Sequence, residues 1–206
     1  MLKMEEGCGY TPTLVCVCGE NGAIMCGDTR MVTVEDGKAV FLDDCRKVFQ
    51  VNDGLLFGAC GMFPVDAMLV EPLAGKISER MNVDSVIKEA ESYMLDRMSV
   101  GLLRECGYVA AGKDRRGRSS IGWVRYSEED DAIHTDKKIY EDHDLVGVYL
   151  PPAAASDEEK WQERLRELLE EDSGETLEAK LHRYIRELSS ISFFVGDNVI
   201  YREIRA

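Results

Sequence analysis

The chain has 206 residues, of which 45% are hydrophobic and 31% charged, so it is long enough for one full-sized domain with a buried core. Its formal net charge of −14 argues against nucleic acid or an anionic membrane as the main partner, because clustered Lys and Arg drive the binding of polyanions. No stretch approaches the roughly 18 apolar residues of a membrane span, and the first residues have no apolar signal core. We therefore expect one cytoplasmic domain over residues 1–206, without nucleic acid or membrane as partners.

The cysteines do not form a recognisable framework. The chain has seven, an odd number, and most lie in apolar segments, unlike the disulfide pattern of a secreted protein. Cys16 and Cys18 are two residues apart, so on a strand they point to opposite faces, and no Cys–His pair has the spacing of zinc ligands. We expect these thiols to be small buried hydrophobic groups, and we expect neither a metal nor a cofactor.

The first half of the chain is dominated by strand patterns. Residues 13–18 and 23–26 are β-prone apolar runs joined by Asn21-Gly22, a strong hairpin signal because both residues tolerate a positive φ. Further strands are predicted at residues 31–34, 38–42, 47–51 and 55–60.

Helical patterns alternate with strands in the rest of the chain. Pro64 predicts the start of a helix through about Arg80, and Asn82 caps a second helix through about Leu103. The remaining prediction is strands at 108–112, 120–126 and 145–150, a hairpin loop at the basic residues 113–118, helices at 156–171 and 173–188, and a closing hairpin of 193–195 with 199–204. Two helix pairs within a strand-rich chain predict two stacked sheets with helices on both outer faces, an α+β fold.

Four segments resemble a known family. Thr11-Pro-Thr-Leu-Val-Cys-Val, followed by Gly27-Asp28-Thr29-Arg30, is similar to the opening of proteasome β subunits. Lys47-Val-Phe-Gln-Val resembles the strand that carries the family's active-site lysine, and Phe57-Gly-Ala-Cys-Gly resembles the strand with its oxyanion-hole amide. The likeness is good over residues 11–80. It implies the four-layer α-β-β-α sandwich of the N-terminal-nucleophile hydrolases.

The resemblance implies a catalytic set. In this family the nucleophile is the hydroxyl of an N-terminal threonine, whose freed α-amine is the base, with a lysine, a carboxylate and a backbone amide beside it. Carried over by position, these are Thr13, Lys47, Asp28 and Gly58, with Thr11 as the alternative nucleophile. The spacing to the acid is one residue short from Thr13 and one long from Thr11. Thr13-Leu-Val also resembles the start of archaeal proteasome-like protein ligases, and we favour Thr13.

The surrounding residues are less well matched. Arg30 follows the acid, and the loose candidates for an outer layer of the site are Ser189, Ser190 and Ser192. Each residue also has an ordinary structural interpretation: Thr13 as a β-branched strand residue, and Asp28 with Arg30 as a surface ion pair.

Residues 1–12 are expected to be an N-terminal extension or propeptide. An amide nitrogen is not a base, so activity would need cleavage before the threonine, and Pro12 makes an awkward cleavage site because of its fixed φ and missing N–H. The leading hypothesis is a threonine amidohydrolase, peptidase or transpeptidase that acts on a peptide or amide substrate after processing. A non-catalytic structural or assembly protein is the alternative, and a small-molecule amidase is a third. Either of the first two is compatible with a homo-oligomer.

Overall fold

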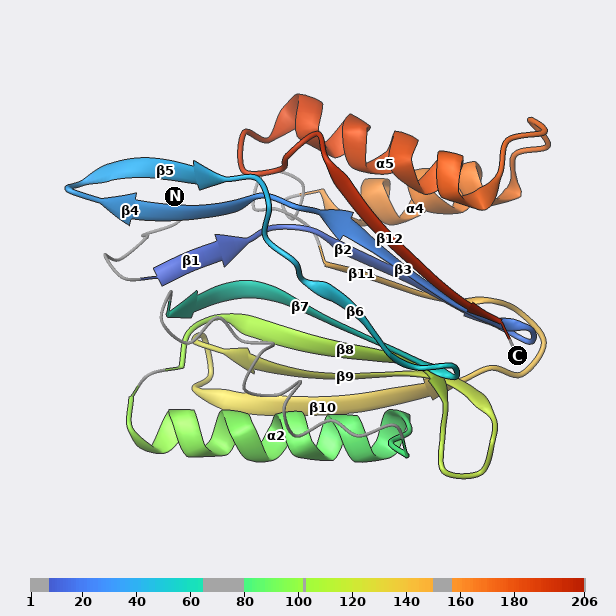
Figure 1. Cartoon of the computed structure of the whole chain (residues 1–206), viewed down its shortest axis with the longest axis horizontal. Helices are drawn as coiled ribbons and strands as arrows, with labels where there is room; N and C mark the ends of the chain where they lie inside the picture. The colour runs from blue at the N-terminus through green and yellow to red at the C-terminus, as the bar shows by residue number, and fades with distance from the viewer. Residues whose placement is uncertain (1–7, 65–79, 102, 150–156, 206) are drawn as a thin grey trace.

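The computed structural model describes residues 8–64, 80–101, 103–149 and 157–205. Two β-sheets lie face to face in it, and helices cover both outer faces (Figure 1). The larger sheet comprises β1 (Cys8–Thr11), β4 (Met31–Glu35), β5 (Lys38–Leu42), β6 (Val48–Asn52), β7 (Leu55–Pro64), β8 (Cys106–Lys113), β9 (Ser119–Ser127) and β10 (Ala132–Ile139). The smaller sheet comprises β2 (Leu14–Gly19), β3 (Gly22–Asp28), β11 (Leu145–Tyr149) and β12 (Val199–Arg205).

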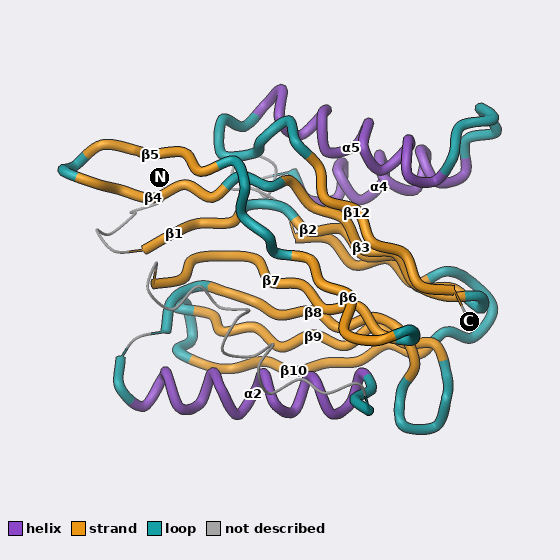
Figure 2. The backbone as a smooth tube through the Cα atoms, viewed as in Figure 1, coloured by secondary structure: helices purple, strands orange, loops and turns teal. Residues whose placement is uncertain are grey.

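The strand order shows how the chain crosses between the layers. The larger sheet has the order β10-β9-β8-β7-β1-β4-β5, with β6 also paired to β7, and the smaller has the order β11-β2-β3-β12. Every pairing is antiparallel. The chain enters through β1 in the larger sheet, crosses to the β2–β3 hairpin in the smaller one, and returns through β4. Figure 2 shows the strands of the two sheets and the loops that connect them.

Three described helices complete the layers. α2 (Val83–Ser99) lies on the outer face of the larger sheet, and α4 (Glu158–Glu170) with α5 (Leu177–Ile191) covers the smaller one (Figure 1). The cap predicted at Asn82 is confirmed, because its side chain accepts from the amide of Ser85 at 3.1 Å while the Ser85 hydroxyl accepts from the amide of Asn82. The predicted four-layer α-β-β-α sandwich is therefore confirmed. No described helix is long and apolar enough to cross a membrane.

The layers divide the interior into three main cores, and a smaller buried cluster of Cys8, Tyr10 and Met62 lies on β1 and β7. Side chains of both sheets meet in the middle, among them Leu14, Met25, Val48, Leu56 and Ile121. One outer core lies under α2 and the other under α4 and α5. Burial of each helix's apolar stripe against a sheet is what holds the four layers together.

The predicted β2–β3 hairpin is present with Gly19 opposite Gly22. Gly22 has a φ of +148°, and a Cβ there would lie 2.0 Å from the carbonyl oxygen of Ile204 on β12. Glycine is needed at this position both for the turn and for the close approach of the last strand.

Several expectations fail at long range. β1 and β10 were not predicted, and the closing hairpin is wrong: residues 193–195 form a turn, and β12 pairs instead with β3, with Val199 opposite Asp28. The last helix starts at Leu177 after the cap residue Thr176, later than expected. The predicted helix from Pro64 to Arg80 falls mostly on residues 65–79, outside the described residues, although Pro64 itself ends β7.

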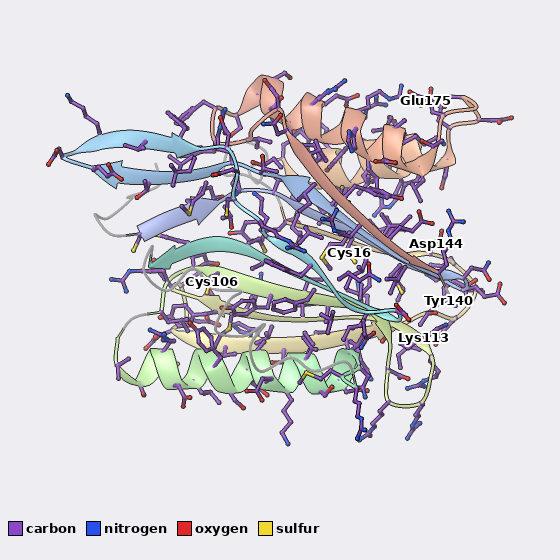
Figure 3. All side chains as sticks on the ribbon, in the orientation of Figure 1. Cys16, Cys106, Lys113, Tyr140, Asp144 and Glu175 are labelled. Carbon is purple, nitrogen blue, oxygen red and sulfur yellow. The ribbon has the colours of Figure 1, made fainter. Side chains whose placement is uncertain are left out.

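All seven cysteines are free and buried, as predicted. Figure 3 shows Cys16 between the two sheets and Cys106 on β8. Burial raises the pKa of Cys18 to about 11 and the pKa values of Cys26 and Cys60 to about 12. These thiols are therefore uncharged and act as apolar groups of the core at neutral pH.

The raised thiol pKa values predict that stability falls at alkaline pH. An unfolded thiol ionises near pH 8.5, whereas a buried one stays protonated, so its contribution is complete below about pH 8.5 and is lost as the pH rises toward the folded pKa. Each such thiol should lower the free energy of unfolding by about 1.4 kcal/mol per pH unit in that window. Urea unfolding between pH 8 and 11 under reducing conditions measures this. A Cys26→Ala variant should show a shallower slope, and an equal slope would contradict the assignment.

A second prediction concerns the contact between α2 and the larger sheet. A Cβ on Gly122 of β9 would lie 2.8 Å from Ile87 and 2.9 Å from Val83, whereas a Cβ on Gly107 of β8 would have no neighbour nearer than 3.6 Å. Gly122→Ala should therefore lower the free energy of unfolding by about 1–3 kcal/mol through overpacking. Gly107→Ala is the matched control and should be neutral or slightly stabilising. Equal urea midpoints for the two variants would refute the close packing of α2.

Candidate active site

The β2–β3 hairpin brings the favoured threonine and the acid to the same end of the smaller sheet. Val15 pairs with Cys26, so the register continued by two residues sets Thr13 opposite Asp28. Lys47 lies directly before β6, and its backbone carbonyl accepts from the amide of Ala59 on β7 at 3.0 Å. The two sheets thereby direct residues from three separate segments toward one place.

Lys47 and Asp28 form a buried ion pair. The Lys47 Nζ lies 2.7 Å from Asp28 Oδ1, and the two side chains are 2% and 0% exposed. The second carboxylate oxygen accepts from the amides of Arg30 and Gly196, each at 3.0 Å, and Lys47 Nζ also donates to the carbonyl of Arg30 at 3.3 Å. These hydrogen bonds compensate for the free energy lost when both charges are removed from water. An isolated buried ion would have no such compensation.

Thr13 lies beside this pair and is completely buried. Its carbonyl oxygen and the Cε of Lys47 lie 2.7 Å and 3.7 Å from the position that a Cβ on Gly27 would take. Glycine at position 27 therefore permits the close approach of Thr13 and Lys47. The Thr13 hydroxyl has no hydrogen-bond partner among the described residues, which is uncommon for a buried polar group and typical of groups kept for chemistry.

The alternative nucleophile lies on β1, the strand that the sequence analysis did not predict. β1 is hydrogen-bonded between β7 and β4, and Thr11 lies opposite Gly61. The Thr11 hydroxyl donates to the carbonyl of Gly61 at 3.3 Å. Gly61 has a φ of +104°, a backbone conformation that requires glycine. Thr11 is thus engaged in the sheet, unlike Thr13.

The backbone amide of Gly58 does not point toward Thr13 and the ion pair. This glycine lies in the middle of β7 between Val48 of β6 and Val109 of β8. Because the next amide, that of Ala59, points toward β6, the amide of Gly58 points toward β8 and into the ladder. A Cβ at this glycine would meet Met25 and Leu14, so Gly58 serves the packing between the sheets. The oxyanion role predicted for Gly58 has no support in this geometry.

Arg30 contacts Asp28 and Lys47 through its backbone only. Its guanidinium binds Asp43, with Nε 2.6 Å from Oδ1 and a second nitrogen 3.1 Å from Oδ2, and it donates to the carbonyls of Phe193 and Val195. The surface ion pair with Asp28 is therefore wrong, because Asp28 is fully buried and pairs with Lys47. Arg30 instead ties the loop after α5 to the site.

The three serines differ in position. Ser189 and Ser190 donate to carbonyls of their own helix, and Ser190 is exposed whereas Ser189 is half-buried. Ser192 is buried at 4% exposure, follows α5, and has an unpartnered hydroxyl among the described residues. Ser192 thus lies in the loop that reaches Asp28 through Gly196, and Ser189 contacts the same loop because its hydroxyl donates to Asp197 at 3.0 Å.

Sequence reasoning missed three contributors. Gly196 binds the acid from 168 residues away along the chain, and Tyr10 of the larger sheet and Tyr149 of the smaller sheet are neighbours across the interior. Burial raises the pKa of both phenols, so they stay neutral. The only sequence signal for this loop was the turn at Gly196-Asp197-Asn198, which the sequence analysis assigned to the closing hairpin of 193–195 with 199–204.

The buried ion pair predicts a large asymmetry between two substitutions. Lys47→Met leaves the Asp28 carboxylate buried without its partner and should cost about 3–5 kcal/mol of stability. Asp43→Ala breaks the ion pair with Arg30, whose side chains are 23% and 46% exposed, and should cost less than about 1 kcal/mol. Urea unfolding at pH 7 compares the two. Similar losses would mean that the Lys47–Asp28 pair is solvated.

Known proteins share the fold of this chain. The profile of the proteasome subunit family matches residues 10–127, more than half of the chain. HslV from Trypanosoma brucei is similar in structure with a TM-score of 0.61 at 18% identity, covering 94% of this chain and 99% of HslV. The Anbu complex from Pseudomonas aeruginosa, solved as a helical assembly, has a TM-score of 0.59 at 12% identity, covering 94% and 81%. No curated protein sequence matches significantly. The chain therefore belongs to the proteasome subunit family and has the fold of the N-terminal-nucleophile hydrolases.

Proposed function

We propose that this chain is the precursor of a threonine amidohydrolase that cleaves peptide or amide bonds, with Thr13 as its nucleophile. The observation that carries the proposal is the buried Lys47–Asp28 pair, whose lysine side chain lies near the backbone of Thr13, a buried residue with an unpartnered hydroxyl among the described residues. A cation held there favours alkoxide character on a neighbouring hydroxyl. Asp28, with its two backbone donors, would fix that cation in position.

The chemistry needs the α-amine of Thr13. Once free, the amine takes the hydroxyl proton as the oxygen attacks the substrate carbonyl, and it then gives the proton to the departing amine. The acyl group remains on the Thr13 oxygen as an ester. Water releases it as a carboxylic acid, or a second amine accepts it, which is the transpeptidase outcome. In the unprocessed chain the nitrogen is an amide bonded to Pro12, and the cycle cannot start.

The N-terminal strand supports a link between processing and substrate access. β1 fills one strand position between β4 and β7, and all four of its residues are buried. Its removal would free two facing strand edges at the same time as it frees the nitrogen. An extended peptide could then add between those edges as an antiparallel strand.

A specific observation favours the alternative, a non-catalytic structural or assembly protein. β1 is paired on both sides and all four of its residues are buried, so the extension is part of the folded domain. A sealed site and Pro12 before Thr13 both suit a subunit that is never processed. We expect either form to associate with copies of itself.

The proposed nucleophile is tested with forms of the chain whose first residue is Thr11 or Thr13, released from a leading fusion protein. We expect the Thr13 form to release fluorophore from short peptide amides, and the full chain to be inactive. In the Thr13 form, Thr13→Ser should retain activity, whereas Thr13→Ala should lose at least about a hundredfold. Rates are measured by single-turnover fluorescence, and folding is checked by urea unfolding.

Other outcomes separate the alternatives. Activity of the Thr11 form alone would move the nucleophile to Thr11. Two results together would reject the enzyme and favour the assembly role: both truncated forms are inactive, and the full chain keeps its full-length mass after expression. Light scattering of the full chain then measures the homo-oligomer.

A further inference from the structure

The smaller sheet leaves part of the larger one uncovered. β11 is the edge strand of the smaller sheet, and beyond it the inner faces of β9 and β10 are only partly covered. A cavity of about 310 Å³ lies there, bounded by β8, β9, β10, β11 and the first turns of α4. The cavity contains none of Thr13, Asp28 and Lys47, and only its end at Leu14 and Tyr149 lies next to the candidate active site.

The free backbone edge of β11 forms one wall of the cavity. Four consecutive residues of this strand, from 146 to 149, all line it. Successive side chains of a strand point to opposite faces, so a cavity that contacts all four must run along the backbone edge. That edge has no partner strand among the described residues. Its amide and carbonyl groups are therefore available to another extended chain.

The floor of the cavity is apolar. Leu14, Ile121 and Trp123 contribute to it, together with the thiols of Cys16 and Cys60. Because burial raises the pKa of Cys60 to about 12, the thiol is neutral and adds no charge to the floor. Such a surface suits apolar side chains that point down from a strand paired to β11.

Charges of both signs stand at the rim. Lys138 Nζ lies 5.5 Å from the centre of the Trp123 ring, and neither Lys138 nor Arg125 has a carboxylate partner in the described parts of the chain. Glu105 and Glu158 are also at the rim, where one accepts from the amide of Glu128 and the other from Gln162. Both cations are thus free to bind a carboxylate, and the acids can accept from an ammonium group.

The exposed edge of β11 defines a length. Residues 146–149 of this strand line the cavity and span about 13 Å at the usual rise per residue. An extended peptide of about four residues has this length. A free peptide carries one ammonium and one carboxylate at its ends, which matches a rim with both signs of charge.

We propose that this cleft binds short, free, apolar peptides of about four residues, which add as a strand to the edge of β11. The apolar side chains lie on Trp123, and the terminal carboxylate binds Lys138 or Arg125. Binding here requires neither processing of the chain nor the Thr13 hydroxyl. The inference is therefore independent of the proposed activity.

The test is calorimetric titration of the full chain with the tetrapeptide Leu-Val-Leu-Val carrying free termini. We expect saturable binding that is weakened about tenfold by amidation of the peptide's carboxylate and abolished by N-methylation of alternate peptide amides. Lys138→Gln and Trp123→Leu should each weaken it at least about fivefold. Lys88→Gln, at an exposed position of α2, is the matched control and should have no effect.

Each contrary result overturns the proposal. Undiminished binding of the N-methylated peptide excludes strand addition, and undiminished binding to Lys138→Gln and Trp123→Leu places the peptide at another site. Absence of binding at millimolar peptide excludes the ligand class. The urea midpoints of the variants must equal that of the parent chain, and Thr13→Ala must bind the peptide normally, which separates this cleft from the active site.

Discussion

The ion pair between Lys47 and Asp28 is the interaction on which the rest of the site depends. It joins the end of β3, the residue before β6 and, through the amide of Gly196, the loop before β12. Two charges removed from water are tolerated only when their remaining hydrogen-bonding capacity is satisfied, and here three further hydrogen bonds to the backbone do so. The pair therefore fixes where the two sheets meet at this end, and it places a cation beside Thr13.

The N-terminal segment combines a structural and a chemical effect. As β1 it completes the larger sheet between β4 and β7, and its burial stabilises the unprocessed fold. The same segment keeps the nitrogen of Thr13 in a peptide bond, where it has no basicity. In the proposed enzyme, the burial of β1 that stabilises the full chain therefore opposes the release of the α-amine of Thr13, whereas a non-catalytic assembly subunit would have no such conflict.

The unequal sizes of the sheets give the molecule a second feature. A smaller sheet cannot cover the whole inner face of a larger one, so the strand edge of β11 and the side of Trp123 remain accessible. Neutral thiols line the interior between the sheets and let the strands approach closely without introducing charge. The layered architecture therefore contains two chemically distinct regions. One is the charged pair at the open end of the β2–β3 hairpin, and the other is the apolar cleft along β11.

The sequence alone determined what depends on neighbouring residues. Alternation and turn chemistry predicted the β2–β3 hairpin at Asn21-Gly22, capping predicted the start of α2 at Asn82, and the strand–helix order predicted the layers. The family resemblance identified Asp28 and Lys47, which the structure brings into contact. Only the tertiary structure revealed that β1 is an inner strand, that β12 pairs with β3, and that the amide of Gly196 donates to Asp28. Local patterns cannot encode these, because each depends on the free energy of contacts between segments far apart in the chain, and such partners are selected only when the sheets pack together.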